Sequence, residues 1–168
     1  MLILLTIAIV SSTLSVGVQP GNCGDGLRHG FRLSAQWFID HSNELWSLKV
    51  DGQRSAHLIT VDGERQFAVP GTAMAALRKV ATEQDFWSLP STYGEPSQTG
   101  FQRLELCDGG RSKVVTVYGL QSSDSLTDHE RRFLTIWVAT RRLFVSKAAA
   151  DVDYAEALLR KPETHRRE

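Results

Sequence analysis

The sequence predicts an α+β domain in which a mainly antiparallel sheet, built from a β-meander and a second β-hairpin, packs against one or two helices. Three observations support this prediction. Apolar and polar residues alternate between positions 31 and 69, the apolar spacing becomes helical between 72 and 84, and both patterns recur after residue 100. A chain of 168 residues has room for one domain and a short additional segment.

Four short strands make up the predicted meander. The first two, over residues 31–39 and 45–50, have apolar residues at alternate positions, as expected of strands with one face in a core: Phe31, Leu33, Ala35, Trp37 and Ile39, then Trp46, Leu48 and Val50. A third strand over 55–61 and a fourth over 66–69 follow. We expect Asp51-Gly52 and Asp62-Gly63 to form hairpin turns, because glycine tolerates a positive φ.

The first predicted helix covers residues 72–84. Its apolar stripe should bury Leu77 and Val80 against the sheet. After a loop over 91–100, strands over 101–107 and 112–118 flank the turn formed by residues 108–110.

A second helix should begin after Thr127, because Glu130 three positions later completes a capping-box pattern. Two arginine pairs, Arg131–Arg132 and Arg141–Arg142, are expected on its solvated face, balanced by nearby acidic residues.

The N-terminal segment indicates export from a bacterial cell. Residues 1–17 contain no charged side chain, and small residues at Ser15 and Gly17 match the pattern that signal peptidase accepts. We therefore expect a signal peptide over 1–17 with cleavage near Gly17, a flexible leader over 18–30, the α+β domain over 31–146, and a helical extension with a polar tail over 147–168. The mature protein should be secreted or periplasmic and have no transmembrane span; a retained membrane anchor is the competing interpretation.

Export also gives the two cysteines a possible role. Cys23 and Cys107 would meet an oxidising compartment, where they can form a disulfide. Closing a loop of about 80 residues contributes at most about 4–5 kcal/mol in the chain-entropy model. The alternative is that both thiols remain free.

Composition argues against several functional classes. The formal net charge of +0 disfavours nucleic acid as a partner, because phosphate binding needs a basic surplus. The five histidines show no metal-ligand spacing, no nucleotide-binding loop joins a strand to a helix, and no nucleophile–base pattern is apparent. We expect no catalytic residue, metal or cofactor, and we predict that the protein is not an enzyme. A hidden hydrolase is the least favoured alternative.

One stretch suggests a binding surface. Trp87 and Tyr93 flank a loop rich in small and polar residues, and Glu95 follows them. We predict that Trp87, Tyr93 and Glu95 contribute to a surface that binds a protein or ligand of the bacterial envelope.

The segment Phe86-Trp87-Ser88-Leu89-Pro90-Ser91-Thr92-Tyr93, together with the order of strands and helices over residues 31–145, resembles small secreted bacterial domains of unknown function. The same order is similar to emfourin-type inhibitors of thermolysin-like metalloproteases. The first resemblance fits an exported binding module without enzymatic activity. The second implies a proteinaceous protease inhibitor, in which residues 95–100 would enter the protease cleft.

Overall fold

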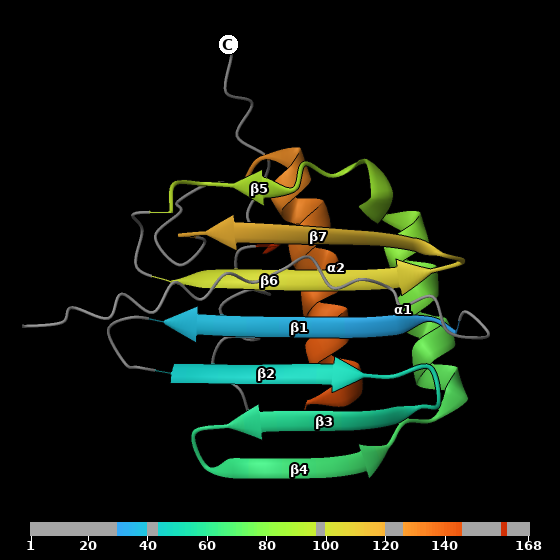
Figure 1. Ribbon diagram of the computed structural model, residues 1–168. Coiled ribbons are helices and arrows are strands. Elements are labelled where there is room, and N and C mark those ends of the chain that lie inside the picture. Colours follow the sequence, from blue (N-terminus) through green and yellow to red (C-terminus); the bar gives the residue numbers. More distant parts are fainter. Residues whose placement is uncertain (1–29, 40–43, 97–99, 120–125, 146–158, 161–168) are drawn as a thin grey trace, which may run out of the picture.

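The computed structural model describes residues 30–39, 44–96, 100–119, 126–145 and 159–160. Their helices and strands form a seven-stranded sheet with two helices behind it (Figure 1). The elements are β1 Arg32–Ile39, β2 Glu44–Val50, β3 Ser55–Thr60, β4 Gly63–Ala68, α1 Gly71–Glu83, the 3-10 helix η1 Phe86–Ser88, β5 Thr92–Tyr93, β6 Phe101–Asp108, β7 Arg111–Tyr118 and α2 Asp128–Phe144. This arrangement confirms the predicted α+β fold class.

The sheet has the strand order β4-β3-β2-β1-β6-β7-β5. Consecutive strands β1 to β4 pair antiparallel and form the expected meander, and β6 and β7 form the expected hairpin. β1 joins these two parts, because it pairs with β2 on one side and with β6 on the other. The first strand in sequence is therefore central in the sheet.

The loop prediction for residues 91–100 was wrong at one point. Thr92 and Tyr93 form β5, which pairs parallel with β7 and makes the sheet mixed. Gly94 permits this placement: its φ is +72°, and an added Cβ would lie 2.6 Å from the carbonyl oxygen of Tyr118. A strand of two residues has too short an alternation pattern to be recognised in the sequence.

The turn between β2 and β3 also differs from the prediction. The residue with a positive φ is Arg54, at 67°, and not Gly52. The turn spans four residues because Asp51 Oδ1 accepts hydrogen bonds from the backbone N–H groups of Gln53 and Ser55, both at 2.9 Å. An aspartate side chain thus determines this turn.

Both helices pack on the same face of the sheet and cover its apolar side chains (Figure 1). Leu77 of α1 is fully buried, as predicted, whereas Val80 is only partly buried at the margin of the core. The predicted capping box of α2 is present, since Thr127 Oγ1 accepts from the Glu130 backbone N–H and Glu130 accepts from that of Thr127. The largest fully buried side chains are Trp137, Phe86, Phe133, Leu48, Leu77, Leu89, Leu104, Leu106, Leu134, Ile136 and Val115.

Several sequence predictions concern residues that the structure does not describe. The expected signal peptide, Cys23, nearly all of the leader and nearly all of the C-terminal extension lie outside the described ranges. Within those ranges, no helix has both the length and the apolarity that crossing a membrane requires.

Candidate functional site

The predicted surface residues Trp87, Tyr93 and Glu95 have different environments. Trp87, on η1, is half-buried beneath the Arg111 guanidinium, which lies 4.4 Å from its ring centroid. Tyr93, on β5, is half-buried with its ring 6.1 Å from the exposed His129 ring. Glu95 is exposed. Two of the three side chains are therefore largely occupied by contacts within the protein.

The Tyr93 hydroxyl is buried and has no hydrogen-bond partner among the described residues. Burial raises the pKa of Tyr93 to about 12, because the phenolate would lose its hydration. Because its hydroxyl is buried, Tyr93 presents little polar chemistry to a ligand.

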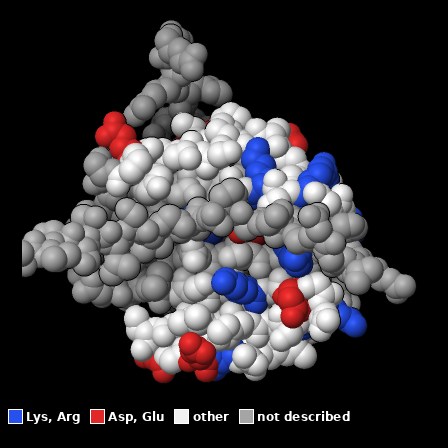
Figure 2. All heavy atoms as spheres, in the orientation of Figure 1, with Lys and Arg blue, Asp and Glu red and all other residues white. Residues whose placement is uncertain are grey.

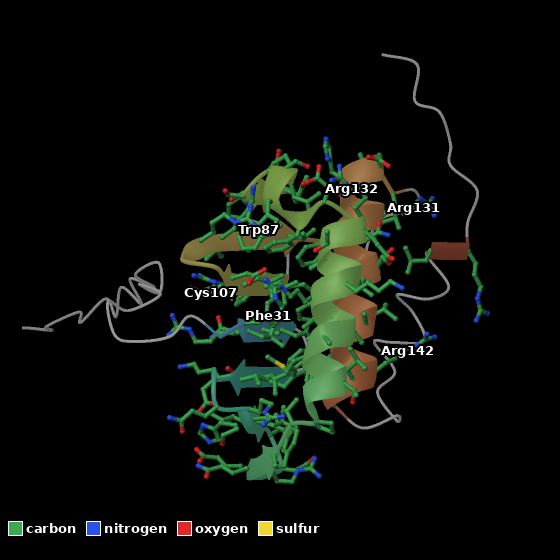
Figure 3. The ribbon with its side chains drawn as sticks, turned by 90° about the vertical axis from the view of Figure 1, so that its right-hand side faces the viewer. Phe31, Trp87, Cys107, Arg131, Arg132 and Arg142 are labelled. Carbon is green, nitrogen blue, oxygen red and sulfur yellow. The ribbon has the colours of Figure 1, made fainter. Side chains whose placement is uncertain are left out.

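Arg132 connects the end of α1 to the beginning of α2. Its guanidinium donates to the carbonyl oxygens of Gln84 and Asp85 at 2.8 and 2.9 Å and to Ser88 Oγ at 2.9 Å. Hydrogen bonding to Ser88, together with the positive charge of Arg132, lowers the pKa of Asp85 below its usual value. Figure 3 shows Arg132 beside Arg131 at the N-terminal end of α2. Arg132 thus holds the segment that carries Trp87 of the predicted binding surface.

Arg131 and Arg132 are only partly exposed, and the expectation that both arginine pairs lie on a solvated face was wrong for Arg141. Its side chain is 3% exposed, and its guanidinium lies 4.4 Å from the Trp46 ring centroid and 6.0 Å from that of Trp37. Trp137 packs on Trp46 with ring centroids 5.1 Å apart. The helical period places Arg141 one turn after Trp137, on the buried face of α2, and stacking on indole rings makes this burial favourable. Arg142 is exposed (Figure 3).

The face of the sheet opposite the helices carries mixed side chains. At one end Phe38, Phe101 and Tyr118 form a row across β1, β6 and β7, with ring centroids 5.8 and 6.3 Å apart. Where the described residues are visible, Figure 2 shows charges of both signs dispersed over this face, without a large patch of one sign. We call this face of the sheet, which carries Phe38, Phe101 and Tyr118, the open sheet face.

Cys107 lies on the open sheet face near the other end of β6, in register with Arg32 at the beginning of β1. Its Sγ atom is 3.7 Å from Ser112 Oγ on β7. Since Cys23 lies outside the described residues, the predicted pairing of Cys23 with Cys107 stays a prediction.

Two surface hollows formed by described residues lie beside the helices. The larger, of about 510 Å³, runs along the outer side of α1 next to Phe31. Its cations are already neutralised within the protein, since Arg78 pairs with Asp108 at 2.8 Å and Lys79 with Glu83 at 3.7 Å. The smaller, of about 420 Å³, lies beside the edge strand β4 and is lined by Leu58, Arg65, Gln66, Phe67 and Phe144. Only this second hollow has a cation, Arg65, without an ion-pair partner among the described residues.

Titratable groups in the described ranges do not assemble into a metal centre, as no cluster of three His, Cys, Asp or Glu side chains with suitable geometry occurs there. Among the described residues, His57 Nε2 lies 3.1 Å from Glu64 Oε2 on the exposed surface of β3 and β4. A cross-strand pair of this kind contributes to hairpin stability.

No known protein family model and no curated protein sequence matches this chain. The resemblances to secreted bacterial domains and to emfourin-type inhibitors therefore stay predictions. Residues 97–99 of the loop expected to enter a protease cleft lie outside the described residues.

Proposed function

We propose that this chain is an exported, non-enzymatic module of the bacterial envelope or secreted fraction, and that it binds a partner protein. One observation supports binding above all. Both helices cover the same face of the sheet, and no described helix or strand covers the open sheet face (Figure 1). A sheet surface that no described element covers, and that carries aromatic, polar and charged side chains, has the composition of a transient protein interface.

The cysteines fit an exported protein. Cys107 lies near the beginning of β1, because its register partner is Arg32. Arg32 is only nine positions after Cys23. A connection of this length spans roughly 30 Å when extended, which easily allows the two sulfur atoms to meet. The described part of the chain contains no free cysteine. We therefore include a Cys23–Cys107 disulfide in the proposal.

The disulfide is tested by mass spectrometry of the mature protein after alkylation without reductant. No added label, and two labels after reduction, would support the bridge. Two labels without reduction would show that both thiols are free. The N-terminal residue of the same sample tests cleavage near Gly17.

Binding is tested by capture from an envelope extract on the immobilised mature protein, with a pair of charge-reversal variants. Lys49, exposed on the open sheet face, and Lys79, exposed on α1, carry the same charge on opposite sides of the molecule. Lys49→Glu should reduce the amount of captured partner, because reversed interface charges slow association. Lys79→Glu should leave it unchanged. Equal capture by all three proteins would contradict binding through the open sheet face.

A second measurement separates this proposal from protease inhibition. The mature protein is titrated against a thermolysin-like metalloprotease with a peptide substrate. We expect full protease activity at micromolar excess of the protein. Stoichiometric inhibition would replace the binding-module proposal with the inhibitor function.

A further inference from the structure

The strand β4 leaves one edge of the sheet open. Among the described strands it pairs with β3 alone, and it is the last strand in the sheet order. Along Gly63–Ala68 only Phe67 is partly buried, and every other residue is exposed. In Figure 1 β4 is the lowest strand, and no described element lies beyond it. An edge of this kind exposes unpaired backbone donors and acceptors.

The register of the β3–β4 hairpin identifies these groups. The turn has two residues, so Thr60 and Gly63 form the hydrogen-bonded pair that closes it. Hydrogen-bonded and non-hydrogen-bonded pairs then alternate along the ladder. The bond from Val69 N–H to the Arg54 carbonyl, at 2.7 Å, continues the same alternation. The backbone N–H and C=O groups that point away from β3 consequently belong to Glu64, Gln66 and Ala68.

The hollow beside β4 supplies side-chain recognition next to these backbone groups. Leu58, Phe67 and Phe144 make its apolar part, and Arg65 contributes a positive charge. Gln66 also lines the hollow, although its side chain belongs to the other face of β4, so the hollow reaches the free edge. Its volume of about 420 Å³ lies within the range of ordinary ligand pockets.

We infer that β4 binds an extended segment of a partner protein as an additional strand, with an apolar side chain in this hollow and a carboxylate on Arg65. This inference rests on the proposed binding function and assigns it a second site, separate from the open sheet face. Arg65 and Phe67 are two positions apart and share the helix-facing side of β4. Side chains on one face of the added strand are also two positions apart. The favoured segment therefore has an apolar residue separated by one position from an acidic residue.

Arg65 determines which charge the partner segment should carry. The guanidinium is exposed and has no ion-pair partner among the described residues, in contrast to Arg78 and Lys79 at the larger hollow. If the β4 strands of two copies paired antiparallel through these outward-pointing groups, Arg65 would lie opposite Gly63, Arg65, Phe67 or Val69 of the second copy. None of these residues supplies a carboxylate. A foreign acidic segment is therefore favoured over self-association.

The test uses two short fluorescent peptides of Thr residues, one with Phe two positions before Glu and one with the reverse order, which cover both strand directions. Binding to the mature protein is measured by fluorescence anisotropy. We expect one peptide to bind, and its variant with Gln in place of Glu to bind about tenfold more weakly, because it lacks the charge-assisted bond to Arg65.

Two substitutions at Gln66 test the backbone contact. Gln66→Pro removes an N–H that points to the free edge and preserves the hydrogen bonds to β3, so the fold should tolerate it. It should weaken peptide binding at least tenfold, whereas Gln66→Ala should leave binding within about twofold of the unsubstituted protein. Arg65→Gln provides an independent test should Gln66→Pro fail to fold. It should abolish the preference for Glu over Gln in the peptide.

Absence of binding by both peptides at millimolar concentration would overturn the inference, as would equal binding by Gln66→Pro and Gln66→Ala. Sedimentation of the protein alone provides another decisive result, because a dimer that Gln66→Pro disrupts would assign this edge to a second copy. Failure of the β4 site leaves the proposed function open to its own test. A partner still captured from the extract in a Lys49-dependent manner would place binding on the open sheet face.

Discussion

Replacing Arg132 with alanine should lower the free energy of unfolding by about 2–3 kcal/mol. The side chain is 20% exposed and donates three hydrogen bonds of 2.8–2.9 Å to the segment that ends α1. Hydrogen bonds to a charged group contribute about 1.5–3 kcal/mol each. These three share one guanidinium and their acceptors lie near the surface, where water replaces a lost donor. The expected loss is therefore close to that of one such bond.

The loss is measured by urea unfolding at neutral pH, with Arg78→Ala as a matched control. Arg78 makes a two-point contact with Asp108, but its side chain is 59% exposed. Its removal should cost less than about 1 kcal/mol. Arg132→Lys should recover only part of the stability, because an ammonium group cannot reproduce the planar arrangement of donors. Equal losses for Arg132→Ala and Arg78→Ala would refute the reasoning that burial makes this contact strong.

Three further substitutions test the core, a buried hydroxyl and a helix cap. Leu77→Ala should cost about 2–5 kcal/mol in urea unfolding, because the side chain is fully buried; an unchanged unfolding midpoint would contradict its place in the core. Tyr93→Phe should be neutral or slightly stabilising at pH 7, since it removes a buried hydroxyl without a partner. The pKa of Tyr93 is about 12 in the folded state and 10.0 in the unfolded state. The contribution of protonated Tyr93 to the free energy of unfolding is therefore fully present below pH 10 and is lost as the pH rises through 12. Tyr93→Phe should reduce that alkaline loss in unfolding curves recorded between these values, and an identical pH profile would argue against it. Thr127→Ala should cost about 1 kcal/mol and lower the melting temperature, whereas Thr72→Ala, an exposed change in the first turn of α1 without a side-chain cap bond, should not.

The sequence predicts the fold well where a single periodicity extends over a whole element. Leu33, Ala35 and Trp37 lie in the core because strand alternation places them on one face, and Thr127 and Glu130 mark the beginning of α2. The prediction fails where contacts between residues distant in sequence determine whether a side chain is buried. Arg141 is buried because the indole of Trp46 offers a favourable surface, which no local charge pattern reveals.

The candidate sites show the same limit. Trp87 and Tyr93 were predicted from an aromatic pair around a polar loop, but the partners that partly bury them, Arg111 and His129, come from β7 and α2. The free edge of β4 depends on strand order. In sequence β4 is one of four similar strands, and it stays at the edge of the sheet because β6 pairs with β1 and not with β4.

That pairing also governs how the chain acquires its structure. Hairpins between neighbouring strands form within microseconds, but β1 cannot bind β6 until the rest of the meander, α1 and β5 have been synthesised. Topologies dominated by such distant contacts fold slowly. Until β6 pairs with it, β1 is itself an exposed edge strand. Partly folded chains aggregate through exposed edge strands. We therefore expect the docking of the β6–β7 hairpin onto β1 to be the slow step of folding.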